Sequence, residues 1–167
     1  MKRKHKKYVR PRKLYDSSRI GKENQLLEKY GLKNKKEIWK TESKIKYYKN
    51  RAKSLLTSDN ESQQRFFDKL NLMGLNVNSI ADVLALDKED LLKRRLSSVI
   101  VSKGLANTSR QARQMIVHKR IAIGNSVVNI PSYIVGVAEE KTIKVKEKNK
   151  KEKIVEESEE NTQEAVE

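Results

Sequence analysis

At the centre of the chain stands the run Thr108-Ser-Arg-Gln-Ala-Arg-Gln-Met-Ile-Val-His-Lys-Arg120. Gln111 follows Thr108 by three residues, which is the spacing of a capping box, where two side chains satisfy free amide groups at a helix start. This spacing predicts a helix that begins at Thr108 and ends near Lys119. We expect the neighbouring segments to be organised around this helix.

The two faces of the predicted helix differ in chemistry. At 3.6 residues per turn, one face carries the apolar side chains Ala112, Met115 and Ile116. The opposite face carries three arginines, namely Arg110, Arg113 and Arg120. We therefore expect the three arginines to point away from the core.

A second helix is predicted just before the first. Asp87 begins an acid-rich segment that suits a helix N-terminus, and Gly104 stands where a left-handed residue commonly follows a helix end. The apolar stripe expected to be buried comprises Leu92, Leu96, Val99 and Ile100. The sequence thus predicts one helix from about Asp87 to the residues before Gly104.

A small sheet is predicted after the arginine-bearing helix. Residues 121–128 form two short apolar runs around Gly124-Asn125, a two-residue turn typical of a β-hairpin. Pro131 favours an extended residue before it, and we expect residues 133–137 to continue as a strand. Residues 142–146 alternate apolar and polar side chains, as a half-exposed edge strand does.

This arrangement resembles the S-four-type RNA-binding domain. The resemblance is carried by Arg94-Arg-Leu-Ser97, Lys103-Gly-Leu-Ala106, Thr108-Ser-Arg-Gln-Ala-Arg113 and Val128-Asn-Ile-Pro-Ser-Tyr133. The flanking runs Lys29-Tyr-Gly-Leu-Lys-Asn-Lys-Lys-Glu-Ile-Trp-Lys40, Ala52-Lys-Ser-Leu-Leu-Thr57 and Asp82-Val-Leu-Ala-Leu86 are similar to the archaeal and eukaryotic branch of the small-subunit ribosomal protein S-four family. The similarity covers roughly residues 5 to 145.

The charge of the chain is strongly asymmetric. Its 167 residues carry a formal net charge of +16, with 38 Lys and Arg against 22 Asp and Glu. Six of the acids and none of the bases lie in residues 154–167, so residues 1–153 hold 38 bases against 16 acids, a net charge of +22. Such a surplus predicts a polyanionic partner.

The first part of the chain reads as a basic arm followed by helices. Residues 1–16 are expected to be an arm, disordered alone, that orders against phosphates, although a solvated tail or a localisation signal has the same composition. Residues 17–86 are expected to form an all-helical domain, in which Ser17 or Ser18, and then Asn34 with Glu37, cap successive helices. The buried stripe of the second of these helices is predicted to comprise Ile38, Ile45, Tyr48, Ala52 and Leu55.

The aromatic residues of the helical part are expected to pack in the core. Trp39 is more typical of a packing anchor than of a stacking platform, and Phe66 and Phe67 are both expected to be buried. Residues 87–146 are then the S-four-type domain, and residues 147–167 are predicted to be a disordered tail. The fold class expected is α+β, in which a helical domain precedes two helices and a short sheet.

No motif in the sequence points to catalysis. There is no G-x-S-x-G, H-E-x-x-H, Walker or Rossmann pattern, and nothing outside residues 87–146 is large enough for the catalytic domains to which similar RNA-binding modules are fused. Without cysteine, and with two histidines far apart, the sequence indicates no metal site. We expect no enzyme, no cofactor and no small-molecule substrate, and the lack of a long apolar stretch indicates a soluble, intracellular protein without membrane contact.

The expected RNA contacts are basic or hydroxyl side chains. The predicted set comprises Arg95, Thr108, Ser109, Arg110, Arg113, His118, Lys119, Arg120, Lys36, Lys40 and the arm residues Lys2, Arg3, Lys4, Lys6, Lys7, Arg10, Arg12 and Lys13. Arg110 and Arg113 lead it because a guanidinium can bind phosphate through two parallel hydrogen bonds. We expect the stem of Arg95 to pack while its guanidinium reaches outward. Thr108 and Ser109 offer hydroxyls and helix N-terminal amides, although capping alone explains them equally well.

The resemblance implies a structural protein of the small ribosomal subunit. Members of the family bind small-subunit rRNA early in assembly, at a junction of RNA helices gripped between the two domains. The family lies in the cytoplasm on the ribosome, near the messenger RNA entry channel, and contacts ribosomal protein S-five at an interface tied to decoding accuracy. Alternatives are a free-standing RNA chaperone or heat-shock protein with the same domain, or a helical DNA-binding protein, although nothing indicates the dimer that DNA binding usually needs.

Overall fold

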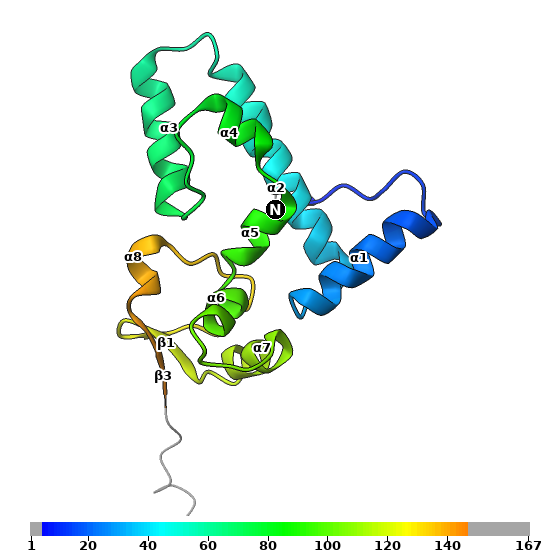
Figure 1. The fold of residues 1–167 in the computed structure, drawn as a ribbon, viewed down its shortest axis with the longest axis vertical. Helices are drawn as coiled ribbons and strands as arrows, with labels where there is room; N and C mark the ends of the chain where they lie inside the picture. Colours follow the sequence, from blue (N-terminus) through cyan, green and yellow to red (C-terminus); the bar gives the residue numbers. More distant parts are fainter. Residues whose placement is uncertain (1–4, 147–167) are drawn as a thin grey trace, which may run out of the picture.

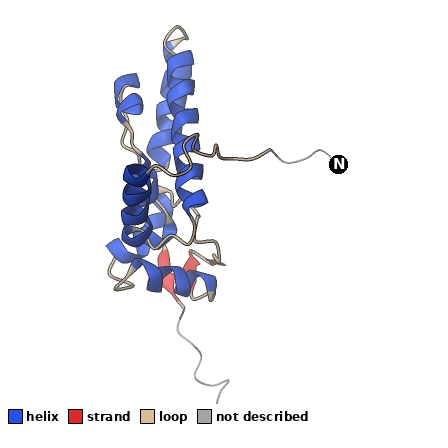
Figure 2. Cartoon of the chain, turned by 90° about the vertical axis from the view of Figure 1, so that its right-hand side faces the viewer, coloured by secondary structure: helices blue, strands red, loops and turns tan. Residues whose placement is uncertain are grey.

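The computed structural model describes residues 5–146 and shows a helix-rich molecule with a small sheet at one end (Figures 1 and 2). The helices of the first part are α1 (Ser17–Lys29), α2 (Lys35–Ser54), α3 (Asn60–Leu72) and α4 (Ile80–Ala85). The elements that follow are α5 (Lys88–Lys93), α6 (Leu96–Ser102), α7 (Ser109–Val117), β1 (Ile121–Ile123), β2 (Ser126–Val127), α8 (Val137–Glu140) and β3 (Ile143–Val145). The expected α+β class is confirmed, while the predicted tail and residues 1–4 of the arm lie outside the described residues.

Helix α2 is the longest element and organises the first part. Asn34 caps it, because its side chain accepts a hydrogen bond from the Lys36 amide at 3.0 Å. Its predicted apolar stripe is buried throughout, and α3, α4 and α5 pack their apolar side chains against the part from Ile45 to Ala52. Phe66 and Phe67 lie only partly buried at the edge of this core, which corrects the expectation that both would be fully inside.

Helix α1 packs against the beginning of α2 around a buried carboxylate. The cap of α1 is Asp16, whose side chain accepts from the amides of Ser18 and Arg19, so the prediction of a serine cap was wrong by one position. Glu23 is buried and accepts hydrogen bonds from Arg19 and from the Trp39 indole, each on its Oε1 atom. Trp39 is half-buried and therefore packs, as expected, and its ring lies 6.1 Å from the ring of Tyr8, centre to centre, at an angle of 34°.

The single helix expected between Asp87 and Gly104 is in fact two helices with a break at Arg94 and Arg95. The Leu96 amide donates to the Tyr133 carbonyl at 2.8 Å, and the Val135 amide donates to the Arg94 carbonyl at 3.0 Å. A segment that lies about 40 residues later in the chain thus takes over the backbone groups that would otherwise continue the helix. Gly104 follows the second of these helices in the left-handed conformation, as predicted.

The prediction of a strand over residues 133–137 was wrong. Only one isolated bridge forms there, between Ile134 and Arg95, and residues 137–140 are the short helix α8. The segment instead pairs with the helix break, through the bonds from Leu96 to Tyr133 and from Val135 to Arg94. Consequently, it continues no strand of the sheet.

The sheet has the order β2-β1-β3 and is antiparallel throughout the described part of the chain. The Gly124-Asn125 turn joins β1 to β2 as predicted, with Gly124 at a φ of 58°. Strand β3 is an edge strand, also as predicted, and pairs Ile143 with Ile123. Ile121 and Ile143 face a second core, which α6 and α7 complete.

Helix α5 connects the two parts through its leucines. Leu91 packs in the core of α2, α3 and α4, whereas Leu92 packs with α1 and the first turn of α2. Leu96, just beyond the break, belongs to the second core with the sheet. The boundary between leucines that pack in the helical part and leucines that pack with the sheet therefore falls at Arg94 and Arg95.

Within residues 5–146, no helix combines the length and apolar character needed to span a bilayer.

Candidate nucleic-acid interface

Helix α7 presents part of its polar face to solvent. Arg110 is exposed, as its position on the predicted helix requires. His118, Lys119 and Arg120 are exposed too, but they follow the end of α7 at Val117, whereas the helix was predicted to reach about Lys119. Among residues 5–146, none of these four side chains lies within ion-pair distance of an acid. The positive charges of Arg110, Lys119 and Arg120 are therefore available to a partner in solution.

Lys119 has an unusual backbone. Its φ is 58°, in the left-handed region where glycine is the common residue after a helix. The Lys119 amide donates to the Ile116 carbonyl and the Arg120 amide donates to the Met115 carbonyl, each at 3.0 Å. These are the two hydrogen bonds of a Schellman helix end. They stabilise the left-handed backbone of Lys119, which is strained in a residue other than glycine, and they place Lys119 and Arg120 side by side in sequence just beyond α7.

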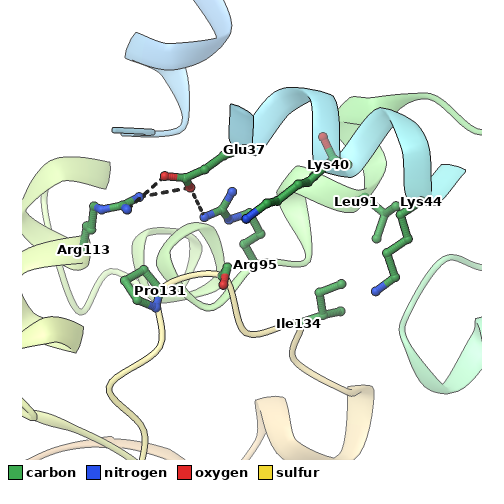
Figure 3. A pocket seen from close by; sticks show the side chains of 10 residues that line it. Glu37, Lys40, Lys44, Leu91, Arg95, Arg113, Pro131 and Ile134 are labelled. Atoms are coloured by element: carbon green, nitrogen blue, oxygen red, sulfur yellow. Dashed lines mark hydrogen bonds and ion pairs between the residues drawn. The ribbon is translucent and has the colours of Figure 1, made fainter. Parts of the chain in front are cut away.

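Arg113 does not point into solvent, which corrects the prediction for this residue. Its two terminal nitrogens donate to the carboxylate of Glu37 in the first turn of α2, at 3.0 and 3.2 Å. Arg95 donates to the same carboxylate from the helix break, as Figure 3 shows. Arg95 is only 3% exposed, so the expectation that its guanidinium would reach outward was also wrong.

The Glu37 carboxylate therefore joins the two parts of the molecule. Burial raises the pKa of this group, but the hydrogen bonds and charges of Arg113 and Arg95 outweigh it and hold the pKa below its ordinary value. The position near the N-terminus of α2 also favours a negative charge. One ionised carboxylate is thus shared between two guanidinium groups that come from different elements.

Sequence reasoning assigned Glu37 to a helix cap and missed this role. The residue is the only acid between Glu28 and Glu42, within a segment rich in lysine. That isolation was the available signal, because a single carboxylate in a basic segment is the one group there that can form an ion pair with an arginine from elsewhere in the chain. The sequence offered no means to identify Arg95 and Arg113 as its partners, since they lie 58 and 76 residues away.

A second contact between the two parts involves the start of α7. Thr108 caps this helix as predicted and accepts from the Gln111 amide at 3.2 Å, while the Gln111 side chain accepts from the amide of Asn107. The Ser109 hydroxyl donates to the Lys29 carbonyl at 2.9 Å. A phosphate could therefore receive this hydroxyl hydrogen only if the bond to Lys29 broke.

The backbone after α1 lies unusually close to Ser109. A Cβ atom placed on Gly31 would lie 2.7 Å from the carbonyl carbon of Ser109, and the φ of Gly31 is 58°. Only glycine fits both the conformation and the approach. The start of α7 therefore contacts the α1–α2 connection at Gly31, and its Arg113 binds Glu37 in the first turn of α2 (Figure 1).

The remaining predicted contacts are distributed over the surface. Lys36 and Lys40 are exposed on α2, and the described bases of the arm, Lys6, Lys7, Arg10, Arg12 and Lys13, are exposed as well. Lys2, Arg3 and Lys4 lie outside the described residues. In the portion of the chain that the structure covers, no group of three or more His, Cys, Asp or Glu side chains could hold a metal ion.

Comparison with known proteins gives a consistent result. The model of the S4 domain family matches residues 94–141. The small ribosomal subunit protein uS4 of Saccharolobus islandicus is 42% identical over 149 residues, which cover 85% of this chain and 82% of the relative. The protein of the same name from Methanococcus aeolicus is 40% identical over 145 residues, covering 83% and 82%.

A third relative, uS4 of Saccharolobus solfataricus, is 41% identical over 149 residues, with the same 85% and 82% coverage. These relatives are structural proteins of the ribosome and not enzymes, which confirms the expectation drawn from the missing catalytic motifs. The resemblance inferred from the quoted sequence runs is confirmed too. The chain belongs to the uS4 family of small ribosomal subunit proteins.

Proposed function

We propose that the protein binds small-subunit rRNA directly and serves as a structural constituent of the small ribosomal subunit. The observation that carries this proposal is that Arg110 on α7, with Lys119 and Arg120 just beyond its end, is exposed and that none of the three forms an ion pair within residues 5–146, in the segment that matches the S4 domain. Basic side chains that lack an acid partner gain most from a phosphate, because no internal ion pair must break first.

Further roles follow from family membership and remain part of the proposal. We infer that the protein acts early in small-subunit assembly in the cytoplasm, contacts ribosomal protein S-five and supports decoding accuracy. Messenger RNA near the entry channel is a further proposed partner. The net charge of +22 on residues 1–153 supports each contact with RNA, since it favours association with any polyanion.

The backbone of Lys119 allows a sharp test of the rRNA contact. Lys119→Gly removes a charge while placing the favoured residue at a φ of 58°, so the variant should keep or raise its thermal midpoint. Combined with Arg110→Gln, it should weaken binding to a small-subunit rRNA junction at least tenfold. The slope of log affinity against log salt should fall by roughly two, one unit for each lost contact.

The matched control replaces two exposed lysines elsewhere, Lys53→Gln on α2 and Lys69→Gln on α3. It changes the net charge by the same amount and should cost little affinity. If both double variants bind the RNA equally, the α7 surface is not the contact. Sedimentation of tagged protein with small subunits in a lysate separates a ribosomal constituent from a free-standing RNA chaperone, which would remain in lighter fractions.

A further inference from the structure

The described part of the chain ends beside the residues that follow α7. The amide of Lys146, the last described residue, donates a hydrogen bond to the Arg120 carbonyl at 2.7 Å. Just before it, Val145 of β3 pairs with Ile121 of β1, and Figure 1 shows both strands at the same end of the molecule as α7. The chain beyond Lys146 therefore starts where the side chain of Arg120 is exposed.

Exposed bases gather at this point. Lys119, Arg120, Lys144 and Lys146 are all exposed, and none of them forms an ion pair within residues 5–146. Lys144 pairs with Ala122 across the sheet, so the four bases lie within a few positions of one another on neighbouring strands. We call these four residues the basic cluster. Its like charges repel one another unless an anion lies close to them.

The sequence beyond the described residues has the complementary composition. Residues 154–167 contain six glutamates and no base, and four of the glutamates fall within residues 156–160. Ile154 and Val155 stand directly before them. On the surface, Val117 at the end of α7 is 54% exposed, two residues before Lys119. An apolar pair followed by acids thus matches an apolar side chain followed by bases.

The connection is long enough for this contact. Glu156 follows Lys146 by ten residues, and ten residues can span at most about 33–36 Å. Helix α7 has nine residues, which corresponds to a length of about 14 Å. The glutamates can therefore reach the basic cluster without any change in the described fold. A short tether also raises their effective concentration at the cluster to about millimolar values, so little intrinsic affinity is needed.

We propose that residues 154–160 dock on the basic cluster and occupy it while no other anion is bound there. The glutamates compensate the four positive charges, and Ile154 and Val155 cover the exposed side chain of Val117. Each exposed ion pair contributes little alone, so the contact needs several glutamates together and weakens as salt is added. The bases of residues 6–13 are a less suitable surface, because this arm lies beside α2 and away from the sheet (Figure 2).

Docking of this kind changes which ligands the bases can bind. A ligand that contacts only a few bases must displace the glutamates and gains little in return. A large folded RNA makes further contacts elsewhere and loses a smaller share of its affinity. The acidic segment thus favours the large ligand over short polyanions. This consequence rests on the proposed function, in which Lys119 and Arg120 contact RNA, whereas the docking itself does not.

The first arm of the test places a nitroxide label in the acidic segment of the full-length protein. The sequence contains no cysteine, so Ser158→Cys provides a single attachment point. Nuclear magnetic resonance then follows the backbone amide signals of the described residues, which broaden when the label is near. We expect broadening at Val117, Lys119 and Arg120 at about 50 mM salt, and at most half as much at about 500 mM, where charges are screened over a shorter distance.

A variant of the acidic segment separates docking from simple tethering. The substitutions E156Q/E157Q/E159Q/E160Q remove four charges and alter no residue of the described fold. In this glutamine variant, the broadening at about 50 mM salt should fall to the level seen at high salt, because the tether is unchanged and only the ion pairs are lost.

A variant of the surface tests the docking site itself. Lys119→Gly/Arg120→Gln removes two charges of the cluster and places glycine at the left-handed position, so the fold should be retained. This surface variant should also lose most of the broadening. The matched control Lys53→Gln/Lys69→Gln changes the net charge equally and should keep it.

The second arm measures affinity for a short unrelated RNA. The glutamine variant should bind it about three- to tenfold more tightly, with a salt slope steeper by roughly one to two, because the freed bases contact phosphates. When the glutamine and surface variants are combined, most of this gain should disappear. A general effect of net charge predicts instead that the gain stays the same.

The outcomes distinguish the docking from its consequence. If broadening is equal with glutamates and glutamines, the segment is near α7 only through its tether and the proposal fails. Charge-dependent broadening on the arm or on α2 instead of the cluster overturns the assigned surface. Broadening of unlabelled protein mixed with labelled protein shows contact between two molecules and overturns docking within one chain. If the docking is observed but RNA affinity does not respond to the glutamine variant, the docking stands and the role of Lys119 and Arg120 in the proposed function fails.

Discussion

Replacing Glu37 by glutamine should destabilise the protein substantially. The change keeps the size of the side chain but removes the charge that Arg95 and Arg113 share. Removing one partner of a buried ion pair typically costs about 3–5 kcal/mol, because the other charge stays buried without compensation. Arg113 is about one quarter exposed and water can solvate it, so the expected loss is smaller, about 2–4 kcal/mol.

The assay is unfolding by urea at neutral pH, with a thermal scan beside it. A loss of about 2–4 kcal/mol corresponds to a thermal midpoint lower by roughly 5–15 °C for a chain of this size. The control is Glu61→Gln, which removes an exposed carboxylate paired with Arg65 on α3 and should change stability by less than about 1 kcal/mol. If Glu37→Gln unfolds at the same urea concentration as this control, the carboxylate does not join the two parts.

The dependence on pH provides a second measurement of the same residue. The pKa of Glu37 is lowered in the folded protein, so its ionised form is favoured there relative to the unfolded chain. Its contribution to stability is therefore fully present above the unfolded pKa, about 4.3, and is lost as pH falls through the folded pKa. The stability difference between wild-type protein and Glu37→Gln should accordingly be constant near neutrality and shrink in acid, and a difference that grows in acid would contradict this reasoning.

Three further predictions follow from the structure and the charge pattern. Gly31→Ala should cost more stability than Gly104→Ala, by about 1 kcal/mol or more in urea unfolding, because both have a positive φ but only Gly31 also lacks space for a Cβ atom. Arg113→Ala should lower the thermal midpoint, whereas Arg110→Ala should leave it unchanged and reduce rRNA affinity; the reverse result would exchange their structural and RNA-binding roles. Deletion of residues 154–167, which removes six acids and no bases, should leave the thermal midpoint unchanged and strengthen filter binding to unrelated RNA, and unchanged binding would show that these residues do not screen the basic surface.

The sequence by itself determined those features that local signals encode. Thr108 and Gln111 located the start of α7, Gly104 the end of α6 and Gly124 the hairpin turn, because caps and turns depend on residues within about one turn of the chain. The buried stripe of α2 followed from the periodicity of its apolar residues, which reflects helix geometry alone. The exposure of Arg110 on α7 followed for the same reason.

Tertiary structure decided where contacts between distant segments compete with local preference. The break at Arg94 and Arg95 exists because the segment around Ile134 hydrogen-bonds the backbone there, and residues 88–103 contain no proline or glycine that would have predicted it. Periodicity placed Arg113 opposite the buried face of its own helix but carries no information about which other element lies nearby. Helix α2 lies there, and an arginine that was expected to point into solvent instead donates to the Glu37 carboxylate and joins the two parts of the molecule.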